Sequence, residues 1–286
     1  MRKLPKPTFS PETVFLACIS NIEDAEFKAR LEDCKQEIIR ASQEFEDKAA
    51  QCELHTINRH NSVAGIVSCD DMKKIYNTKM AKDGQPGREY YMKIRTASPQ
   101  NTCPLCGHRK VRTLDHFLPK ATFPTLAVTP VNLIPSCFEC NFDKRATQPA
   151  SAKEVTIHPY FDDFFVTDRW LYAEVEQTTP VSLSYFVSPP EHWEETKQAR
   201  IRQHFKVYNL ATLYGSHAGS ELASIAYLLE QAAEDGPDGV RNELKKQASS
   251  RHRAHLNSWD AVLYSALSES EWFCSVGFSL LKSSIH

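Results

Sequence analysis

Two Cys-x-x-Cys pairs are the strongest chemical signal in the sequence. They are Cys103 with Cys106 and Cys137 with Cys140. Each pair can direct two sulfur atoms toward one cation, and two pairs complete the tetrahedral four-thiolate shell that Zn²⁺ prefers. Such a shell has no open position, so we predict a structural zinc. Ordinary buried cysteines are the alternative, but the matched spacing, with Gly107 directly after the first pair, argues against it.

The segment between the two pairs contains a carboxylate next to an imidazole. Asp115 and His116 lie in a pattern that predicts a short strand of a hairpin, so their side chains should face opposite ways. Asn132 precedes the second pair, and Asn141 follows it in the expected first turn of a helix. A turn-capping role for Asp115, and a core or zinc-binding role for His116, are the alternatives.

These residue types suit hydrolysis of a phosphodiester bond. A neutral imidazole with a pKa near its ordinary value of about 6.5 can activate a water molecule. One carboxylate and one amide oxygen can hold a single Mg²⁺ or Mn²⁺, which neutralises developing charge and leaves positions for water and phosphate. The four-thiolate zinc cannot take this role because its shell is full.

The combined motif resembles the zinc-stapled branch of the HNH endonucleases, whose core is the ββα-metal fold. The similarity covers residues 103–145. It implies that His116 is the general base, and that Asn132 pins the hairpin loop and orients His116. It also implies that Asp115 and Asn141 hold the catalytic divalent ion. Asn141 stands where the last His of the HNH motif often lies, which we interpret as a change of metal preference.

The wider layout is similar to the HNH nuclease subunits of Septu-type anti-phage systems, the PtuB family. The shared features are a long N-terminal helix, a central zinc module and a helical tail with an aromatic His-Pro-Tyr-Phe-Asp segment. This resemblance implies an ATPase partner that gates the nuclease, and the sequence has no nucleotide-binding motif of its own. We expect a DNA endonuclease in such a complex. The alternatives are a stand-alone restriction-type HNH enzyme and a non-catalytic zinc-stabilised nucleic-acid-binding module.

Composition and charge limit the class of protein. The chain has 286 residues, of which 41% are hydrophobic and 24% charged, which is typical of globular proteins. No apolar run is long enough to cross a bilayer, and the Pro-rich start is unlike a secretory signal. The cysteines outside the two pairs are scattered, as free thiols are in a reducing cytosol. We therefore expect a cytoplasmic protein with no membrane partner.

The net charge of −2 argues against a protein that binds nucleic acid over its whole surface. The candidate module is locally more basic. Its predicted nucleic-acid contacts are Arg109, Lys110, Arg112, Lys120, Lys144 and Arg145. A basic site on a neutral body is typical of a nuclease that needs a partner or a particular form of DNA.

We predict a mostly helical α+β protein with a ββα-metal, treble-clef-like core. Residues 1–95 would form an N-terminal helical region for partner docking or packing, and 96–150 the zinc-stapled nuclease module. Residues 151–286 would form a hairpin, from alternation at 171–175 and 181–187, followed by C-terminal helices.

Two helix starts are predicted within the N-terminal region. Ser20 and Glu23 have the form of a capping box, and the apolar stripe that follows to Cys52 predicts an amphipathic helix of about eight turns. Its length favours a docking helix over one packed on its own core. A second box, at Ser68 and Asp71, opens a shorter helix.

Overall fold

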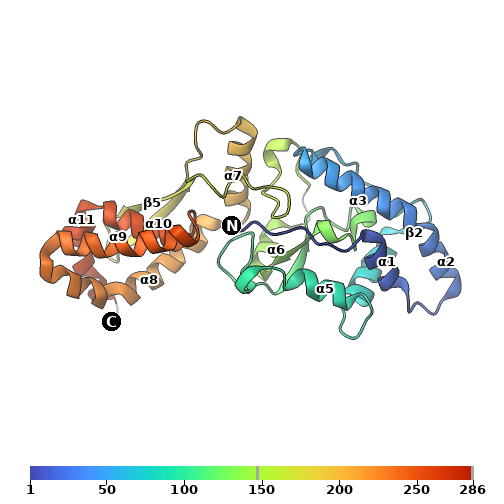
Figure 1. Cartoon of the computed structure of the whole chain (residues 1–286), viewed down its shortest axis with the longest axis horizontal. Coiled ribbons are helices and arrows are strands. Elements are labelled where there is room, and N and C mark those ends of the chain that lie inside the picture. The colour runs from blue at the N-terminus through green and yellow to red at the C-terminus, as the bar shows by residue number, and fades with distance from the viewer. Residues whose placement is uncertain (146–147, 285–286) are drawn as a thin grey trace. The chain divides into compact units, whose positions relative to one another are not determined.

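The computed structural model describes residues 1–145 and 148–284 and divides into two compact units, Met1–Asp163 and Phe164–His286 (Figure 1). The described residues are mostly helical, with small two-stranded antiparallel sheets. The predicted α+β class is therefore confirmed. The regions predicted as 1–95 and 96–150 both fall in the first unit.

The first unit is built from short helices around two small hairpins. Its α-helices are α1 (Pro11–Ile19), α2 (Ala25–Asp33), α3 (Lys35–Ala50), α4 (Cys69–Ile75), α5 (Arg88–Arg95) and α6 (Phe138–Lys144). Its strands are β1 (Ser62–Val63), β2 (Val67–Ser68), β3 (Thr113–His116) and β4 (Leu133–Ser136). A π-helical turn, Tyr76–Met80, continues α4. The predicted capping box at the start of α4 is confirmed, because Ser68 and Asp71 exchange side-chain and backbone hydrogen bonds.

The predicted long helix is wrong in two respects. The chain forms two helices, α2 and α3, that meet at Cys34. The N-cap is Asp24, whose Oδ1 accepts the N–H of Phe27 at 2.9 Å. Ser20 instead follows α1, where its hydroxyl donates to the carbonyl of Ala17. Cys34 keeps a right-handed backbone (φ −80°, ψ −8°), so the apolar residues continue at helical spacing across the junction. For this reason the sequence pattern does not reveal where α2 ends and α3 begins.

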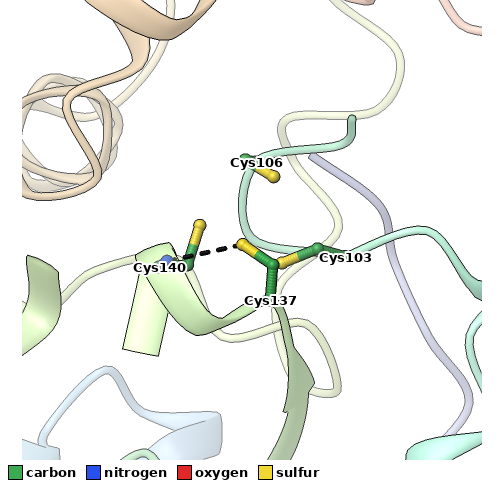
Figure 2. Close-up of side chains that lie close together, drawn as sticks. All are labelled: Cys103, Cys106, Cys137 and Cys140. Atoms are coloured by element: carbon green, nitrogen blue, oxygen red, sulfur yellow. Dashed lines mark hydrogen bonds between the residues drawn. The ribbon is translucent and has the colours of Figure 1, made fainter. Parts of the chain in front are cut away.

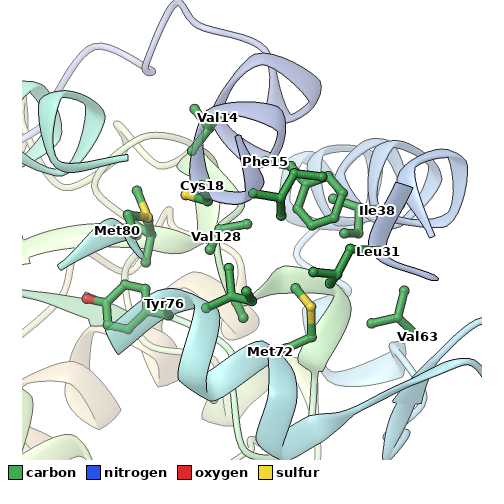
Figure 3. Packing of buried hydrophobic residues seen from close by; sticks show 14 of the residues in the cluster. Val14, Phe15, Cys18, Leu31, Ile38, Val63, Met72, Tyr76, Met80 and Val128 are labelled. Atoms are coloured by element: carbon green, nitrogen blue, oxygen red, sulfur yellow. The ribbon is translucent and has the colours of Figure 1, made fainter. Parts of the chain in front are cut away.

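One hydrophobic core joins the N-terminal helices to the β3–β4 hairpin (Figure 3). Its buried members include Phe15, Cys18, Leu31, Ile38, Met72, Tyr76, Leu114, Val128 and Leu133. Ile38, on the apolar face of α3, is fully buried here, so the stripe is accounted for by packing within the unit. Burial of each such side chain contributes about 1.5–3 kcal/mol, and the hairpin shares this stabilisation.

The second unit places a hairpin against helices. Strands β5 (Leu171–Glu176) and β6 (Ser182–Val187) pair antiparallel with Leu171 opposite Val187, so the predicted hairpin is confirmed. The helices that follow are α7 (Glu195–Val207), α8 (Leu210–Ala232), α9 (Gly236–Ala254), α10 (Trp259–Glu269) and α11 (Glu271–Ser275). In the described part of the chain, no helix has the length and apolar character needed to span a membrane.

The cap of α2 gives a stability prediction. Asp24→Ala should lower the free energy of unfolding by about 1 kcal/mol, because the N–H of Phe27 loses its acceptor. Ser20→Ala is the matched control and should change it by less than about 0.5 kcal/mol. Urea unfolding of both variants measures the difference. If both variants lower the free energy of unfolding equally, Asp24 does not stabilise α2 as its N-cap.

Candidate functional site

The four cysteines of the two predicted pairs converge on one point (Figure 2). Their sulfur atoms all lie within 4.8 Å of one another. The four side chains are buried, with at most 1% of each residue exposed. A tetrahedral zinc with Zn–S bonds of about 2.3 Å would hold its sulfurs about 3.8 Å apart. The cluster could therefore hold a structural metal such as zinc.

Local backbone geometry explains how the cysteines meet. The first pair lies on a tight loop, where the N–H of Gly107 donates to the carbonyl of Cys103 at 2.8 Å. Gly107 has φ +67°, a conformation that favours glycine. In the second pair, Cys137 is the N-cap of α6 and its sulfur accepts the N–H of Cys140. The cluster thus ties a loop before β3 to the turn between β4 and α6.

Between these two anchors, β3 and β4 pair antiparallel. Asp115 lies opposite Ile134, and His116 opposite Leu133. The two neighbouring side chains make their contacts on different elements, as alternation along a strand requires. Asp115 reaches α6, whereas His116 reaches the loop between the strands.

His116 is held as a neutral imidazole. Its Nε2 lies 2.8 Å from the carbonyl of Ala127, and since a carbonyl only accepts, Nε2 is the donor. Nδ1 therefore carries the lone pair, and it has no hydrogen-bond partner among residues 1–145 and 148–284. Burial lowers the pKa of His116 well below its ordinary value, and the charges of Lys120 and Lys144 lower it further. Nδ1 is therefore the ring nitrogen that could accept a proton. The pKa of His116 is lower than the ordinary value expected from the sequence, because the buried site disfavours the charged imidazolium.

Asp115 forms a buried ion pair with Lys144. The Nζ of Lys144 lies 3.0 Å from Oδ2 of Asp115, and only 6% and 8% of the two side chains are exposed. Lys144 also donates to the carbonyl of His116. Burial raises the pKa of Asp115, and the ammonium group of Lys144 opposes that effect. Lys144 was predicted to contact nucleic acid at the surface; it is instead an internal partner of the site, so that prediction is corrected.

Asn132 closes the loop that holds His116. It is fully buried, and its Oδ1 accepts the N–H of Leu118 at 2.7 Å. Its Nδ2 donates to the carbonyls of Leu118 and Leu126. Leu126 directly precedes Ala127, whose carbonyl accepts from His116. The amide therefore fixes the backbone next to the acceptor of the imidazole.

Asn141 is half-buried on α6, three residues before Lys144. Side chains three apart on a helix lie about 5–6 Å from each other at Cβ. Asn141 therefore lies on the same short helix as Lys144, the partner of Asp115.

The other predicted nucleic-acid contacts differ in exposure. Lys110, Arg112 and Arg145 are exposed. Arg109 is half-buried and its Nε lies 3.6 Å from Oε1 of Glu139. Lys120 is half-buried, near the ring described next.

Sequence analysis missed one contributor to the site, Tyr76. Its ring packs edge-on against His116, with 4.4 Å between centroids, and Lys120 lies over its face at 4.7 Å. Tyr76 begins the π-helical turn after α4, and such turns are frequent at functional sites. No local pattern marks it, because tertiary packing alone brings it from the N-terminal helices to the hairpin.

The aromatic segment after α6 also supports the hairpin. The hydroxyl of Tyr160 donates to the carbonyl of Leu133 at 2.9 Å. The ring of His158 lies 4.3 Å from that of Phe117, the residue after His116. The aromatic segment therefore contacts both β4 and the residue that follows β3.

The buried ion pair gives a second prediction. Lys144→Ala should lower the free energy of unfolding by about 3–5 kcal/mol, because it leaves Asp115 buried and uncompensated. The double change Lys144→Met with Asp115→Asn should recover part of that loss. Urea unfolding is the measurement. Lys93→Ala, which breaks an exposed pair with Glu89, is the control and should have little effect. A Lys144→Ala protein as stable as wild type would contradict this role.

Comparison with known proteins gives two similarities. No protein-family model and no solved structure matches the chain. Protein ea31 of Escherichia phage lambda is 29% identical over 235 residues, which make up 79% of each chain. The Septu protein PtuB of Bacillus thuringiensis is 38% identical over 81 residues, which make up 27% of this chain and 31% of PtuB. The chain is thus partly similar to a Septu protein and, over most of its length, to a phage protein.

Proposed function

We propose that the chain is a metal-dependent HNH-type endonuclease that hydrolyses DNA, with β3, β4 and α6 as its ββα-metal core. The observation that supports this best is the pairing of a neutral, oriented imidazole with a carboxylate on adjacent strand residues. His116 is oriented by the carbonyl of Ala127, and Asp115 faces the helix that carries Asn141. A general base and a cation site must both reach the same phosphate, and two residues of one short strand can meet that requirement.

In the proposed reaction His116 takes a proton from the attacking water at Nδ1. The hydrogen bond from Nε2 to Ala127 and the ring of Tyr76 limit rotation of the imidazole. Asn132 acts indirectly, by fixing the loop next to that carbonyl. The carbonyl of Ala127 would keep accepting the Nε2–H of the imidazolium that forms.

Asp115 and Asn141 would hold the divalent ion. An oxygen-only donor set of one carboxylate and one amide fits a hard cation such as Mg²⁺ or Mn²⁺. When bound, that ion would stabilise the charge that develops on the phosphate and on the leaving oxygen. Lys144 already pairs with the same carboxylate. When the ion binds, Lys144 would either stay paired with the second oxygen of Asp115 or move away from the carboxylate. The four cysteines serve separately, as the site of a structural zinc.

The exposed cations Lys110, Arg112 and Arg145 would contact backbone phosphates, with Arg109 and Lys120 closer to the site. We propose residues 96–150 as the nuclease module, 1–95 as a helical region that packs on it and can dock a partner, and 151–286 as a hairpin and helical region.

The partial similarity to PtuB supports a role in anti-phage defence. We propose that the chain is the nuclease subunit of a cytoplasmic complex and that an ATPase partner gates it. The sequence lacks a Gly-rich phosphate loop, so ATP would bind to that partner.

Cleavage of supercoiled plasmid in Mg²⁺ or Mn²⁺ tests the proposal. His116→Ala should reduce the cleavage rate by about 100-fold or more, the usual contribution of a general base. His192→Ala is the control, because this exposed histidine lies in the other unit. Bound zinc and the circular dichroism spectrum should be the same in all three proteins.

The assay should be run on the chain alone and with any copurifying protein. Cleavage that appears only with the partner supports the gated form of the proposal. If the His116→Ala protein cuts as fast as wild type, or if wild type cuts under neither condition, the nuclease assignment fails.

A further inference from the structure

Two aromatic side chains stand exposed on the helix that carries Asn141. Phe138 is 63% exposed and Phe142 is 76% exposed. They are four residues apart on α6, so they lie on the same face of the helix. Single exposed apolar residues are common on protein surfaces, but an adjacent pair of whole phenyl rings beside a candidate catalytic site indicates an interaction surface.

The order of residues around α6 places this pair next to the proposed reaction site. Cys140 and Lys144 occupy the buried face, against the sulfur cluster and Asp115. With 3.6 residues per turn, Asn141 lies on the boundary between that face and the one that carries the two rings. A DNA strand whose phosphate reaches Asp115 and Asn141 can therefore continue over Phe138 or Phe142.

On α6 and in the loop before β3, the cations Arg109, Lys110, Arg112 and Arg145 outnumber the acidic residues Glu139 and Asp143. Arg145 is exposed and follows directly at the end of α6. Glu139 follows Phe138 in the sequence, and its Oε1 lies 3.6 Å from Nε of Arg109. That contact brings the basic loop with Arg112 close to the start of the helix. If a protein partner covered the two rings with an apolar groove, that contact would not need the cations around them. A nucleic-acid strand uses both features, since its phosphates need cations and its bases need flat apolar surfaces.

We propose that Phe138 and Phe142 stack on unpaired bases next to the scissile phosphate, so that the preferred substrate is DNA with a single-stranded or locally opened segment. The inference rests on the proposed nuclease function and names its substrate class. In an intact duplex each base already stacks on its neighbours, and its faces are not available to a phenyl ring.

Binding to a short oligothymidylate, to an abasic strand of the same length and to a duplex tests this inference. Fluorescence anisotropy is measured without added divalent cation, so that binding is separated from cleavage. The variants change Phe138 and Phe142 together, to Ala, to Leu or to Tyr, and Tyr227→Ala, at an equally exposed aromatic of the other unit, is the control. Bound zinc is verified in every protein.

The expected result is that the Ala and Leu pairs weaken binding to oligothymidylate by about tenfold or more, the size expected of base–aromatic stacking. The Tyr pair and the Tyr227→Ala control should bind like wild type. All proteins should bind the abasic strand equally, because it offers no bases. Wild type should bind the oligothymidylate more tightly than the duplex.

Three results would overturn the inference: wild type that binds no DNA, Phe variants that bind oligothymidylate like wild type, or an equal loss on the abasic strand. A Leu pair that binds DNA normally, or Phe variants that lose only a copurifying protein, would instead assign the rings to a protein contact. The plasmid assay separates the two proposals. Cleavage that does not depend on the rings removes only this inference, whereas ring-dependent binding without any cleavage removes only the nuclease.

Discussion

The convergence of four thiolates is the constraint on which the site depends. One pair precedes β3 and the other begins α6, so a single ion bound to all four would hold both ends of the hairpin segment. Each strand of that hairpin has 4 residues and α6 has 7. Elements this short are marginal when isolated, because too few hydrogen bonds offset the loss of chain entropy. A bound ion, together with the core shared with the N-terminal helices, would supply the missing stabilisation.

This anchoring fixes two adjacent side chains against different supports. Asp115 is paired with Lys144 of α6, and His116 is bonded to the loop that Asn132 closes. Burial acts on both groups, since it lowers the pKa of the imidazole and raises that of the carboxyl. The buried cation of Lys144 limits the second effect. On α6, Cys140 and Lys144 are buried in the site, whereas Phe138 and Phe142 are exposed to solvent.

The sequence was sufficient for the local features of the fold. Metal-ligand spacing predicted the sulfur cluster, and alternation predicted the β5–β6 hairpin. Each of these patterns repeats over residues that are close together in the sequence. Features that depend on three-dimensional packing were missed. Lys144 looked like a surface cation until α6 was placed against β3, and Tyr76 reaches His116 from a distant helix. The junction at Cys34 was hidden because a right-handed residue there preserves the apolar stripe. The roles of Asp115, His116, Asn132 and Asn141 in catalysis remain predictions.

Hydrogen–deuterium exchange before and after extraction of the bound metal tests the central claim most directly. Metal analysis establishes that the four-cysteine site is filled and then emptied. Our account predicts that amides of β3, β4 and α6 lose protection when the metal is removed, whereas those of β5 and β6, in the other unit, keep it. Unchanged protection of β3, β4 and α6 after complete removal would contradict it, since the hairpin and helix would then be held without the ion.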